Sequence, residues 1–585
     1  MACSCASFFV GYVGVEPVLH HLRKKPLLPT PEAYCVLIVI LIAIILRLIL
    51  LTFHWPITNS DEGNMGILAR HVAFNGEWPI FFYGLPYLGP LEGYTAAPLF
   101  HLFGPSTFTL RLALLPFFAL FLLCMYYLTR LLYTPRLAAF TALLFCFGSE
   151  EILRRQLRAV GEYPETLFFA AFICLVISWL VLSPYEVTGR TRTTARRIVV
   201  YGVLGLVVGC ALWVDFLILP FLGTATILLL LFCRRELVSL SGLSLLAGIL
   251  IGAFPLLYYN VTAPLSDNSL AVLLSIQHSG STQHLPFLQQ LVGTFMISLP
   301  NATGFNPLCH ASAFPYFSTV ISMPCVVLQG GWGLGYVILW VCATFSTAYV
   351  IWRGWRARTL SQSDNANMER QSIKRQCCRL MLLLSTGGTI LVYAISPAAA
   401  VFPEPTARYL LCVLVATPAV LWPLWNERWL ARTLSSWQTT LLLGAKGTIL
   451  SLLLILFIMG TFLTFMQIPQ AQNAYTQQDQ LVQRLLALDA TRIYSEYWTC
   501  NRLTFQSEEK IICSSLDEKL HPGFDRYTPY TDIVKNSNHP TYVFPQGFQQ
   551  VALLDTRMNR DSQFSHIYQR FVFVGYVIFA PKRNY

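Results

Sequence analysis

Long apolar stretches separated by short polar segments dominate this chain. A helix needs about 20 apolar residues to cross a bilayer. About eleven stretches approach or reach that length, and the third is short: 33–53, 112–133, 136–149, 164–183, 198–214, 216–232, 238–259, 333–352, 379–396, 408–425 and 441–465. The fifth and sixth form one continuous run, which we divide at Trp213 and Asp215, an interfacial aromatic residue followed by a charge. One long tilted helix is the alternative there.

The pattern changes after about residue 466. A helical repeat covers 474–488, and short β-rich runs follow: TRIYS, EKIIC, TYVF, QVALLD and RFVFVGYVIF. Alternating helix and strand signals predict a small α/β domain. The expected fold is therefore a multi-pass α-helical membrane protein with a C-terminal α/β domain. Its parts are an N-terminal tail (1–32), a transmembrane module (33–465) whose first loop is 54–111, and the domain 466–585.

Composition agrees with this class. The chain is 55% hydrophobic and 12% charged, whereas soluble proteins carry about 25% charged residues. The net charge of +11 does not indicate nucleic-acid binding, because the cations lie in short patches between apolar runs, as orientation signals do.

The cation patches predict the orientation in the plasma (inner) membrane. With eleven spans they fall on one side: Arg23 to Lys25, Arg130 and Arg136, Arg190 to Arg197, Arg234 and Arg235, Arg353 to Arg375, and Arg428 and Arg432. The loop 260–331 contains no Lys or Arg. Cytoplasmic loops are the positive ones, so we expect a cytoplasmic N-terminus, with the first loop and the C-terminal domain on the external face.

Most of the 16 cysteines lie inside apolar runs, where they are expected to be buried hydrophobic residues. No Cys or His spacing indicates a metal site. Cys309 with Cys325, and Cys500 with Cys513, are spaced to pair if their compartment is oxidising.

The first loop holds the strongest chemical signal. Asp61 and Glu62 follow the first span directly, and acidic residues so close to a membrane helix are costly unless they have a function. Ser60 is a good N-cap, and the apolar repeat from Met65 to Ala73 predicts a short amphipathic helix on the membrane surface. The alternative is that Ser-Asp-Glu simply begins a helix.

Further features favour a functional role for this acidic pair. An aromatic and glycine-rich segment with Tyr83 and Tyr87 suits stacking on sugar rings, and Glu92 and Arg111 follow. The next external loop carries cations against the topology rule, which therefore need another function: Arg154, Arg155 and Arg158. Arg111 and these arginines are candidates to hold an anion.

These residues resemble the GT-C polyprenyl-phosphate-dependent glycosyltransferases, specifically the glycosyltransferase family 39-like group. That group includes protein O-mannosyltransferases and the lipid A aminoarabinose transferase. Its first external loop carries an Asp-Glu pair, a surface helix, an aromatic-Gly-Pro stretch and a terminal Leu-Arg. The counterparts here are Asp61-Glu62, FFYGLPYLGPLEGYTAAPLFHLFGPS and Leu110-Arg111. Weaker matches are Arg408-Tyr409 at the mouth of span ten and SEYWTCNRLTF in the C-terminal domain.

The resemblance implies inverting transfer of a sugar from a polyprenyl-phosphate donor to an envelope acceptor (a glycan, lipid or protein) at the external face. The Asp of the pair is the general base in this family, which carries over to Asp61, with Glu62 beside it. A phosphate leaving group needs cations rather than a general acid; Arg111 is the first candidate, ahead of the second-loop arginines.

Other positions carry over less directly. Glu162 or Glu165 matches the family's second acidic position, and the alignment leaves both open. Glu92 stands where the aminoarabinose transferases have a Lys-Pro-Pro segment, so their phosphate-binding lysine has no clear counterpart. The resemblance leaves a divalent cation open as cofactor, and no metal ligand is assigned.

Two alternatives belong to other functional classes. A polyprenyl-linked sugar flippase or small-molecule transporter predicts charges inside spans and paired broken helices, and Arg47 is almost the only such charge. A non-catalytic membrane scaffold with the same fold is the other alternative. In both, the Asp61 carboxylate is dispensable.

Overall fold

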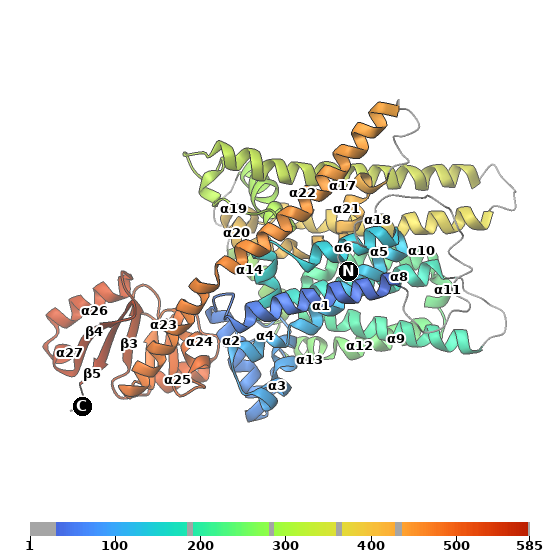
Figure 1. Ribbon diagram of the computed structural model, residues 1–585. Coiled ribbons are helices and arrows are strands. Elements are labelled where there is room, and N and C mark those ends of the chain that lie inside the picture. The colour runs from blue at the N-terminus through green and yellow to red at the C-terminus, as the bar shows by residue number, and fades with distance from the viewer. Residues whose placement is uncertain (1–30, 184–190, 280–285, 359–365, 427–435, 583–585) are drawn as a thin grey trace.

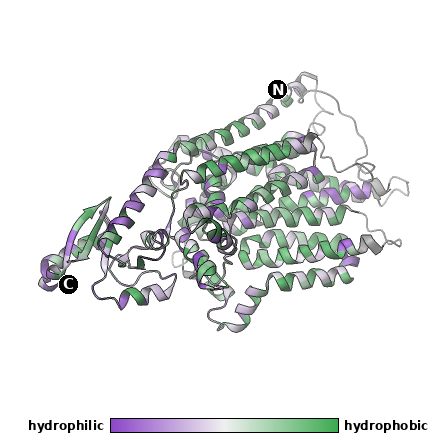
Figure 2. Ribbon diagram, turned by 60° about the horizontal axis from the view of Figure 1, so that its bottom comes forward, coloured by the Kyte–Doolittle hydropathy of each residue, from purple (hydrophilic) through white to green (hydrophobic). Residues whose placement is uncertain are grey.

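The fold consists of a bundle of long apolar helices with a small mixed sheet at one end (Figure 1). The computed structural model describes residues 31–183, 191–279, 286–358, 366–426 and 436–582. Residues 1–30 of the predicted tail 1–32, and the predicted orientation signals Arg190, Arg428 and Arg432, lie outside these ranges. Apolar residues cover the long helices, and polar residues are concentrated nearer the sheet (Figure 2).

Every predicted span coincides with helix. The helices are α1 (Pro31–Thr52), α4 (Thr107–Leu112) with α5 (Leu115–Leu132), α6 (Pro135–Cys146), α8 (Tyr163–Leu182), α9 (Thr191–Val214), α10 (Leu219–Phe232), α12 (Leu240–Gly252) with α13 (Phe254–Thr262), α17 (Met323–Arg358), α18 (Ala366–Ala394), η6 (Ala407–Ala416) with α21 (Thr417–Trp425), and α22 (Ser436–Met466). Among the described residues, eight helices are long and apolar enough to cross a membrane, or nine if the α12–α13 pair, bent by 62°, is one span. Pro135–Cys146 and Phe216–Phe232 are shorter apolar helices.

The predicted break between the fifth and sixth spans is confirmed. Helix α9 ends at Val214, and the Asp215 carboxylate accepts a hydrogen bond from the Leu217 amide at 2.9 Å. Asp215 thereby caps the 3₁₀ turn η3 (Phe216–Ile218), which leads into α10. A buried carboxylate at the end of a span is thus used to start the next one.

The segment predicted as the long external loop is largely helical. It contains α14 (Ser269–Ser279), α15 (Phe287–Val292), η4 (Gly293–Ser298), α16 (Leu299–Thr303) and η5 (Ala311–Ala313). A disulfide joins Cys309 to Cys325 at the start of α17, so one of the two cysteine pairings is confirmed here. Two short helices, α19 (Ala398–Val401) and α20 (Pro403–Thr406), lie beside this segment before η6. Another short helix, α11 (Arg234–Leu237), lies at the end of the bundle away from the sheet (Figure 1).

The first loop forms α2 (Ser60–Arg70), the π-helical turn η2 (His71–Asn75) and α3 (Leu91–Phe103); the second loop forms α7 (Glu150–Leu157). The predicted Ser60 cap is wrong. Asn59 caps α2, its side chain accepting from the Glu62 amide at 3.0 Å. Ser60 lies inside the first turn, where its hydroxyl accepts from the Asn501 amide at 3.2 Å instead.

The C-terminal part begins with α23 (Ile468–Ala487), which continues the direction of α22 (Figure 1). Its sheet has the order β2-β1-β3-β5-β4. The strands are β1 (Arg492–Ser495), β2 (Ile512–Ser515), β3 (Thr541–Pro545), β4 (Tyr568–Phe573) and β5 (Tyr576–Pro581). Strand β1 is parallel to β2 and β3, whereas β5 is antiparallel to β3 and β4. The helices are α24 (Tyr497–Gln506), α25 (Thr528–Lys535), α26 (Gln549–Arg560) and α27 (Ser562–Ile567).

The predicted α/β composition of this part is confirmed, with one wrong element. QVALLD was expected to be β-rich, but it lies in α26, where Val551 and Leu554 are buried one helical turn apart. Three residues is the helical spacing, so tertiary burial of this pair decides against the strand. The Cys500–Cys513 disulfide, which the spacing also allowed, ties α24 to β2.

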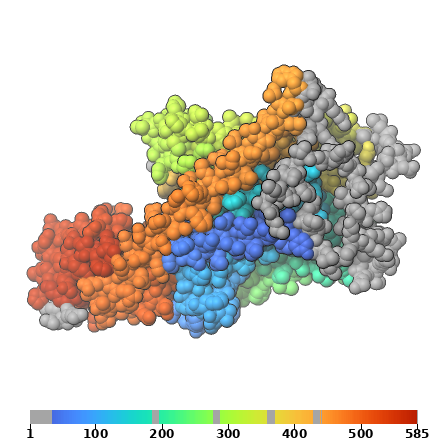
Figure 3. All heavy atoms as spheres, viewed as in Figure 1, coloured from blue at the N-terminus to red at the C-terminus, as the bar shows by residue number. Residues whose placement is uncertain are grey.

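Helix α2 is enclosed rather than half-exposed, so the surface-helix expectation is wrong. It packs between α3 and α24, and every residue from Glu62 to Ala69 is buried. Figure 3 shows the first loop (blue) pressed against the C-terminal part (orange). Two glycines permit this: a Cβ on Gly63 would lie 2.5 Å from the Asn501 carbonyl oxygen, and one on Gly66 would lie 2.6 Å from the Phe505 ring.

Gly66→Ala is therefore expected to weaken the contact between α2 and α24. The added methyl group overlaps an aromatic ring, and such overpacking costs about 1–3 kcal/mol. Thermal unfolding of the detergent-solubilised protein measures the loss. Gly331→Ala is the matched control, since no atom lies within 4 Å of its added Cβ. Equal melting temperatures for the two variants would contradict close packing at Gly66.

Candidate active site

The Asp61-Glu62 pair divides into a buried residue and an accessible one. Glu62 is fully buried and receives both ends of the Arg111 guanidinium, Nε to Oε1 at 2.7 Å and Nη2 to Oε2 at 2.6 Å. The Ala159 amide adds a third hydrogen bond to Oε1 at 3.1 Å. Glu62 therefore joins α2 to α4 and to the second loop, and its charge is neutralised inside the protein.

Asp61 faces the C-terminal part and keeps one oxygen open. Its Oδ1 accepts from Arg526 Nη2 at 2.7 Å and from the Tyr497 hydroxyl. Within the described part of the chain no group hydrogen-bonds to Oδ2. The side chain is 18% exposed, so solvent or a substrate can reach the carboxylate.

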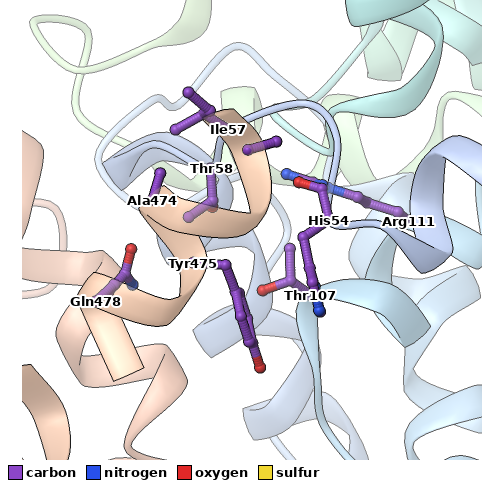
Figure 4. A pocket seen from close by; sticks show the side chains of 9 residues that line it. His54, Ile57, Thr58, Thr107, Arg111, Ala474, Tyr475 and Gln478 are labelled. Atoms are coloured by element: carbon purple, nitrogen blue, oxygen red, sulfur yellow. The ribbon is translucent and has the colours of Figure 1, made fainter. Parts of the chain in front are cut away.

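Arg111, the first candidate for the donor phosphate, is occupied. Besides Glu62 it bonds the His54 carbonyl at 3.3 Å, and it is 1% exposed. A small hollow on its other side is lined by His54, Thr107 and Tyr475 (Figure 4). This space of about 10 Å³ holds about one water molecule, and is too small for a sugar phosphate.

The second-loop arginines are mostly neutralised by their own helix. Arg154 pairs with Glu150 and Glu151, and Arg155 pairs with Glu151, Nε to Oε1 at 2.6 Å. These ion pairs within α7 give the arginines a structural role, which accounts for cations in a loop predicted to be external. Arg158 differs: it donates to the Ile57 carbonyl at 2.6 Å, and its buried Nε has no partner. Burial lowers the Arg158 pKa to about 10.

Arg408 is the other cation of the predicted set without a carboxylate. It lies in η6, with its guanidinium 6.0 Å from the Tyr163 ring centroid and 5.3 Å from that of Tyr409. Within the described ranges it forms no ion pair, and its Nε is buried without a hydrogen-bond partner. Its Nη2 donates to the Tyr409 hydroxyl at 3.4 Å. A partly buried guanidinium without a carboxylate partner keeps donors available to an anion.

Glu162 and Tyr87 connect the Asp61 side of the site with Arg408. Burial raises the pKa of Glu162, the charge of Arg408 opposes that rise, and the charge of Asp61 adds to it. Burial first, then Glu162 and Tyr409, raises the pKa of Tyr87 to about 12, against the charges of Arg526 and Arg408. Groups from the first loop, second loop, η6 and C-terminal part therefore share one electrostatic environment.

Glu92 and Glu165 form a buried acidic pair beside this environment. Both are fully buried. Glu92 Oε2 accepts from the Gly161 amide at 2.8 Å, whereas its Oε1 and both Glu165 oxygens have no partner of their own. Burial first, and the charge of Glu165 second, raise the pKa of Glu92 well above its ordinary value. Burial disfavours the charged form of a carboxyl group, so folding favours the protonated form of Glu92.

Tyr83 belongs to a separate polar network that joins the first loop to the C-terminal part. Its hydroxyl bonds Glu77 at 2.8 Å and His71 Nδ1 at 2.8 Å. His71 Nε2 in turn lies 2.9 Å from Glu509, which also receives the Tyr530 hydroxyl at 2.6 Å. The Tyr83 side chain, predicted to stack on a sugar, thus helps to hold the first loop against the C-terminal part. The main-chain carbonyl of Tyr83 accepts a hydrogen bond from Arg526 at 3.4 Å.

Sequence reasoning missed Arg526 and Tyr497. Tyr497 lies in the SEYWTCNRLTF segment, which is one of the weaker matches to the family, but the sequence assigns no role to this tyrosine. Arg526 lies in an irregular loop between β2 and α25, where no periodicity or motif marks it. Among the described residues, no group of three or more His, Cys, Asp or Glu side chains is placed to hold a metal ion.

No family model and no curated protein matches the chain. Among solved structures, ArnT from Cupriavidus metallidurans bound to undecaprenyl phosphate is similar over 95% of this chain and 99% of its own, at 14% identity and a TM-score of 0.48. The archaeal oligosaccharyltransferase AglB from Archaeoglobus fulgidus, in complex with an inhibitory peptide and a dolichol-phosphate, is similar over 94% of this chain and 74% of its own, at 13% identity and a TM-score of 0.45.

Glu92→Gln is expected to stabilise the protein increasingly as the pH rises. A carboxyl group whose pKa is raised by folding holds its stability below the unfolded value of 4.5 and loses it as the pH rises toward the folded value. Glutamine resembles the protonated acid and retains the bond from Gly161. The gain in melting temperature over wild type is expected to be near zero at about pH 4 and to reach about 2 °C or more at about pH 8.

The control for this prediction is Glu518→Gln, which changes an exposed carboxylate. It should give a melting-temperature difference that does not vary with pH. A Glu92→Gln variant that becomes less stable than wild type as the pH rises would show that Glu92 is needed in its charged form.

Proposed function

We propose that this protein transfers a sugar from a polyprenyl-phosphate donor to a hydroxyl group of an envelope acceptor, with inversion at the anomeric carbon. The observation that carries the proposal is the state of Asp61. One carboxylate oxygen is held by two donors and the other is open, and Arg408, whose guanidinium forms no ion pair among the described residues, acts on the same environment. This is the arrangement that a base and a phosphate-binding cation require.

In the proposed step Asp61 Oδ2 accepts the proton of the acceptor hydroxyl while that oxygen attacks the anomeric carbon. The bond from that carbon to the phosphate oxygen breaks, and its electron pair leaves with the polyprenyl phosphate. One carboxylate on the acceptor side gives a single displacement and hence inversion. The leaving group is already an anion, so cations stabilise it without a general acid.

The pairing of the arginines changes the choice of phosphate ligand. Arg111, Arg154 and Arg155 each have a carboxylate partner, and taking any of them for a phosphate would leave a carboxylate unpaired. Arg408 and Arg158 have buried Nε atoms without partners. We assign the donor phosphate first to Arg408, which lies beside Tyr409, and second to Arg158.

The proposed orientation places this site on the external face. Helix α11, with Arg234 and Arg235, lies at the end of the bundle away from the sheet, as a cytoplasmic cation patch should (Figure 1). The Cys309–Cys325 and Cys500–Cys513 disulfides belong to segments at the sheet end (Figure 1). Disulfides form in oxidising compartments, which supports an external first loop and C-terminal part.

A transporter is less well supported. Its strongest sequence feature was Arg47 inside the first span. That guanidinium bonds Gln156 Oε1 at 2.6 Å and the Cys146 carbonyl at 3.0 Å, and is completely buried. Arg47 therefore holds α1 to the second loop and to α6, which is a structural use of the charge.

Asp61→Asn tests the proposed base. Loss of a general base lowers the rate by about 10²–10⁴-fold, so transfer from a labelled polyprenyl-phosphate sugar in purified membranes should fall by that amount. Asp555→Asn, which alters an exposed ion pair with Arg570, should transfer at the wild-type rate. Thermal unfolding of both variants checks that they are correctly folded. Wild-type transfer by a folded Asp61→Asn protein would refute the mechanism.

Arg408→Gln tests the phosphate ligand. Removing one charged donor from a developing anion costs about 10²–10³-fold in kcat, and Arg408→Lys should recover part of that loss because the charge is kept. Arg154→Gln is the matched control, since Arg154 is paired with Glu150 and Glu151. A larger rate loss for Arg154→Gln than for Arg408→Gln would reverse the assignment.

A further inference from the structure

We infer that Arg526 and Tyr497, both from the C-terminal part, are positioning residues that orient Asp61 so that its Oδ2 meets the acceptor hydroxyl. This inference rests on the proposed function, because it assigns a role relative to Asp61 as the base. It makes the C-terminal part a contributor to the active site, so that the first-loop site is incomplete without it.

The three side chains form a closed set of contacts. Arg526 Nη2 donates to Asp61 Oδ1 at 2.7 Å, Arg526 Nε donates to the Tyr497 hydroxyl oxygen at 2.8 Å, and the Tyr497 hydroxyl donates to Oδ1. Terminal torsions of aspartate side chains are broad, so the carboxylate plane is not fixed by its own chain. Two donors on one oxygen fix it, and the other oxygen is left for the substrate.

Arg526 is itself held in place by aromatic rings and by the first loop. Its side chain is 9% exposed, and its guanidinium lies 4.9 Å from the Phe524 ring centroid and 5.2 Å from that of Phe82. Gly84 leaves room for it, because a Cβ there would lie 3.0 Å from Arg526 Cδ and 3.2 Å from its Cα. The first loop therefore accommodates this arginine along its length.

Tyr497 is fixed by the first turn of α24. Glu496 caps that helix, accepting from the Trp498 amide, and the Cys500–Cys513 disulfide and the Gly63 and Gly66 contacts described above anchor it. Burial first, and the charge of Asp61 second, raise the pKa of Tyr497. The phenol therefore keeps its proton and remains a donor to Asp61.

The polar network around Glu509 holds Arg526 and Tyr497 near Asp61. Glu509, at the end of α24, receives Arg70, His71 and Tyr530. Arg70 and His71 end α2, whose first turn carries Asp61. The C-terminal part is thus bound at both ends of the helix that presents the proposed base, which keeps the Asp61 contacts in register.

The test measures kcat and the donor KM for Arg526→Gln, Tyr497→Phe, Arg526→Lys and the double variant Arg526→Gln/Tyr497→Phe. A misplacement of about 1 Å can cost about 10²-fold in rate, so each of the first two variants should lose about tenfold or more in kcat with an unchanged KM for the donor. Arg526→Lys should recover part of the loss. The double variant should lose less than the product of the single losses, because the two residues act on one oxygen.

Arg570→Gln is the matched control, since Arg570 pairs with Asp555 at 2.7 Å on an exposed face of the same part; it should leave kcat and KM unchanged. Wild-type kcat in both Arg526→Gln and Tyr497→Phe, while Asp61→Asn is inactive, would overturn this inference and leave the proposed function standing. Losses that are strictly multiplicative, or that follow the fraction of unfolded protein, would also overturn it. Activity in Asp61→Asn would instead overturn the proposed function.

Discussion

The buried ion pair between Glu62 and Arg111 is the interaction on which the rest of the site depends. Breaking a buried pair by removing one partner leaves an uncompensated charge at a cost of about 3–5 kcal/mol, so α2 and α4 are strongly constrained to remain together. The third hydrogen bond, from the Ala159 amide, extends that constraint to the second loop. With α2 fixed on this side, Asp61 in the same turn is directed to the opposite side, toward the C-terminal part. The two acids of one motif therefore face opposite sides: Glu62 holds the scaffold, and Asp61 is the base in the proposed mechanism.

The same principle separates the arginines. A guanidinium with a carboxylate partner contributes to packing and has few donors left for a ligand, whereas a guanidinium without a carboxylate partner keeps donors for an anion. Arg111 and Arg155 belong to the first kind, and Arg408 to the second. The nearby Glu92 and Glu165 form no ion pair with a cation among the described residues, and burial raises the pKa of Glu92.

The sequence predicted the architecture well because its signals are local. Each span is a continuous apolar run, and the break at Asp215 is marked by the residue that caps the next turn. Local signals failed where tertiary contacts decide. Asn59 rather than Ser60 caps α2 because the Ser60 hydroxyl is used by α24; the QVALLD segment is helical because two of its residues are buried one turn apart. Among the candidate site residues, Asp61 is predicted from the motif, but the pairing of Arg111 with Glu62 and the contact from Arg526 to Asp61 join positions 49 and 465 residues apart. Neither spacing nor composition records such distances.

The Cys500–Cys513 bond has a consequence for how this protein is made and handled. It closes a loop of 13 residues that contains the second half of α24, and loops of about this size gain roughly 3 kcal/mol from a disulfide. The Cys309–Cys325 bond is a second disulfide, and it joins the segment before α17 to the start of that helix. A chain produced or stored in a reducing medium therefore lacks both bonds, and the anchor of Tyr497 is weakened. Sample history, and not only sequence, becomes a variable in any assay of this protein.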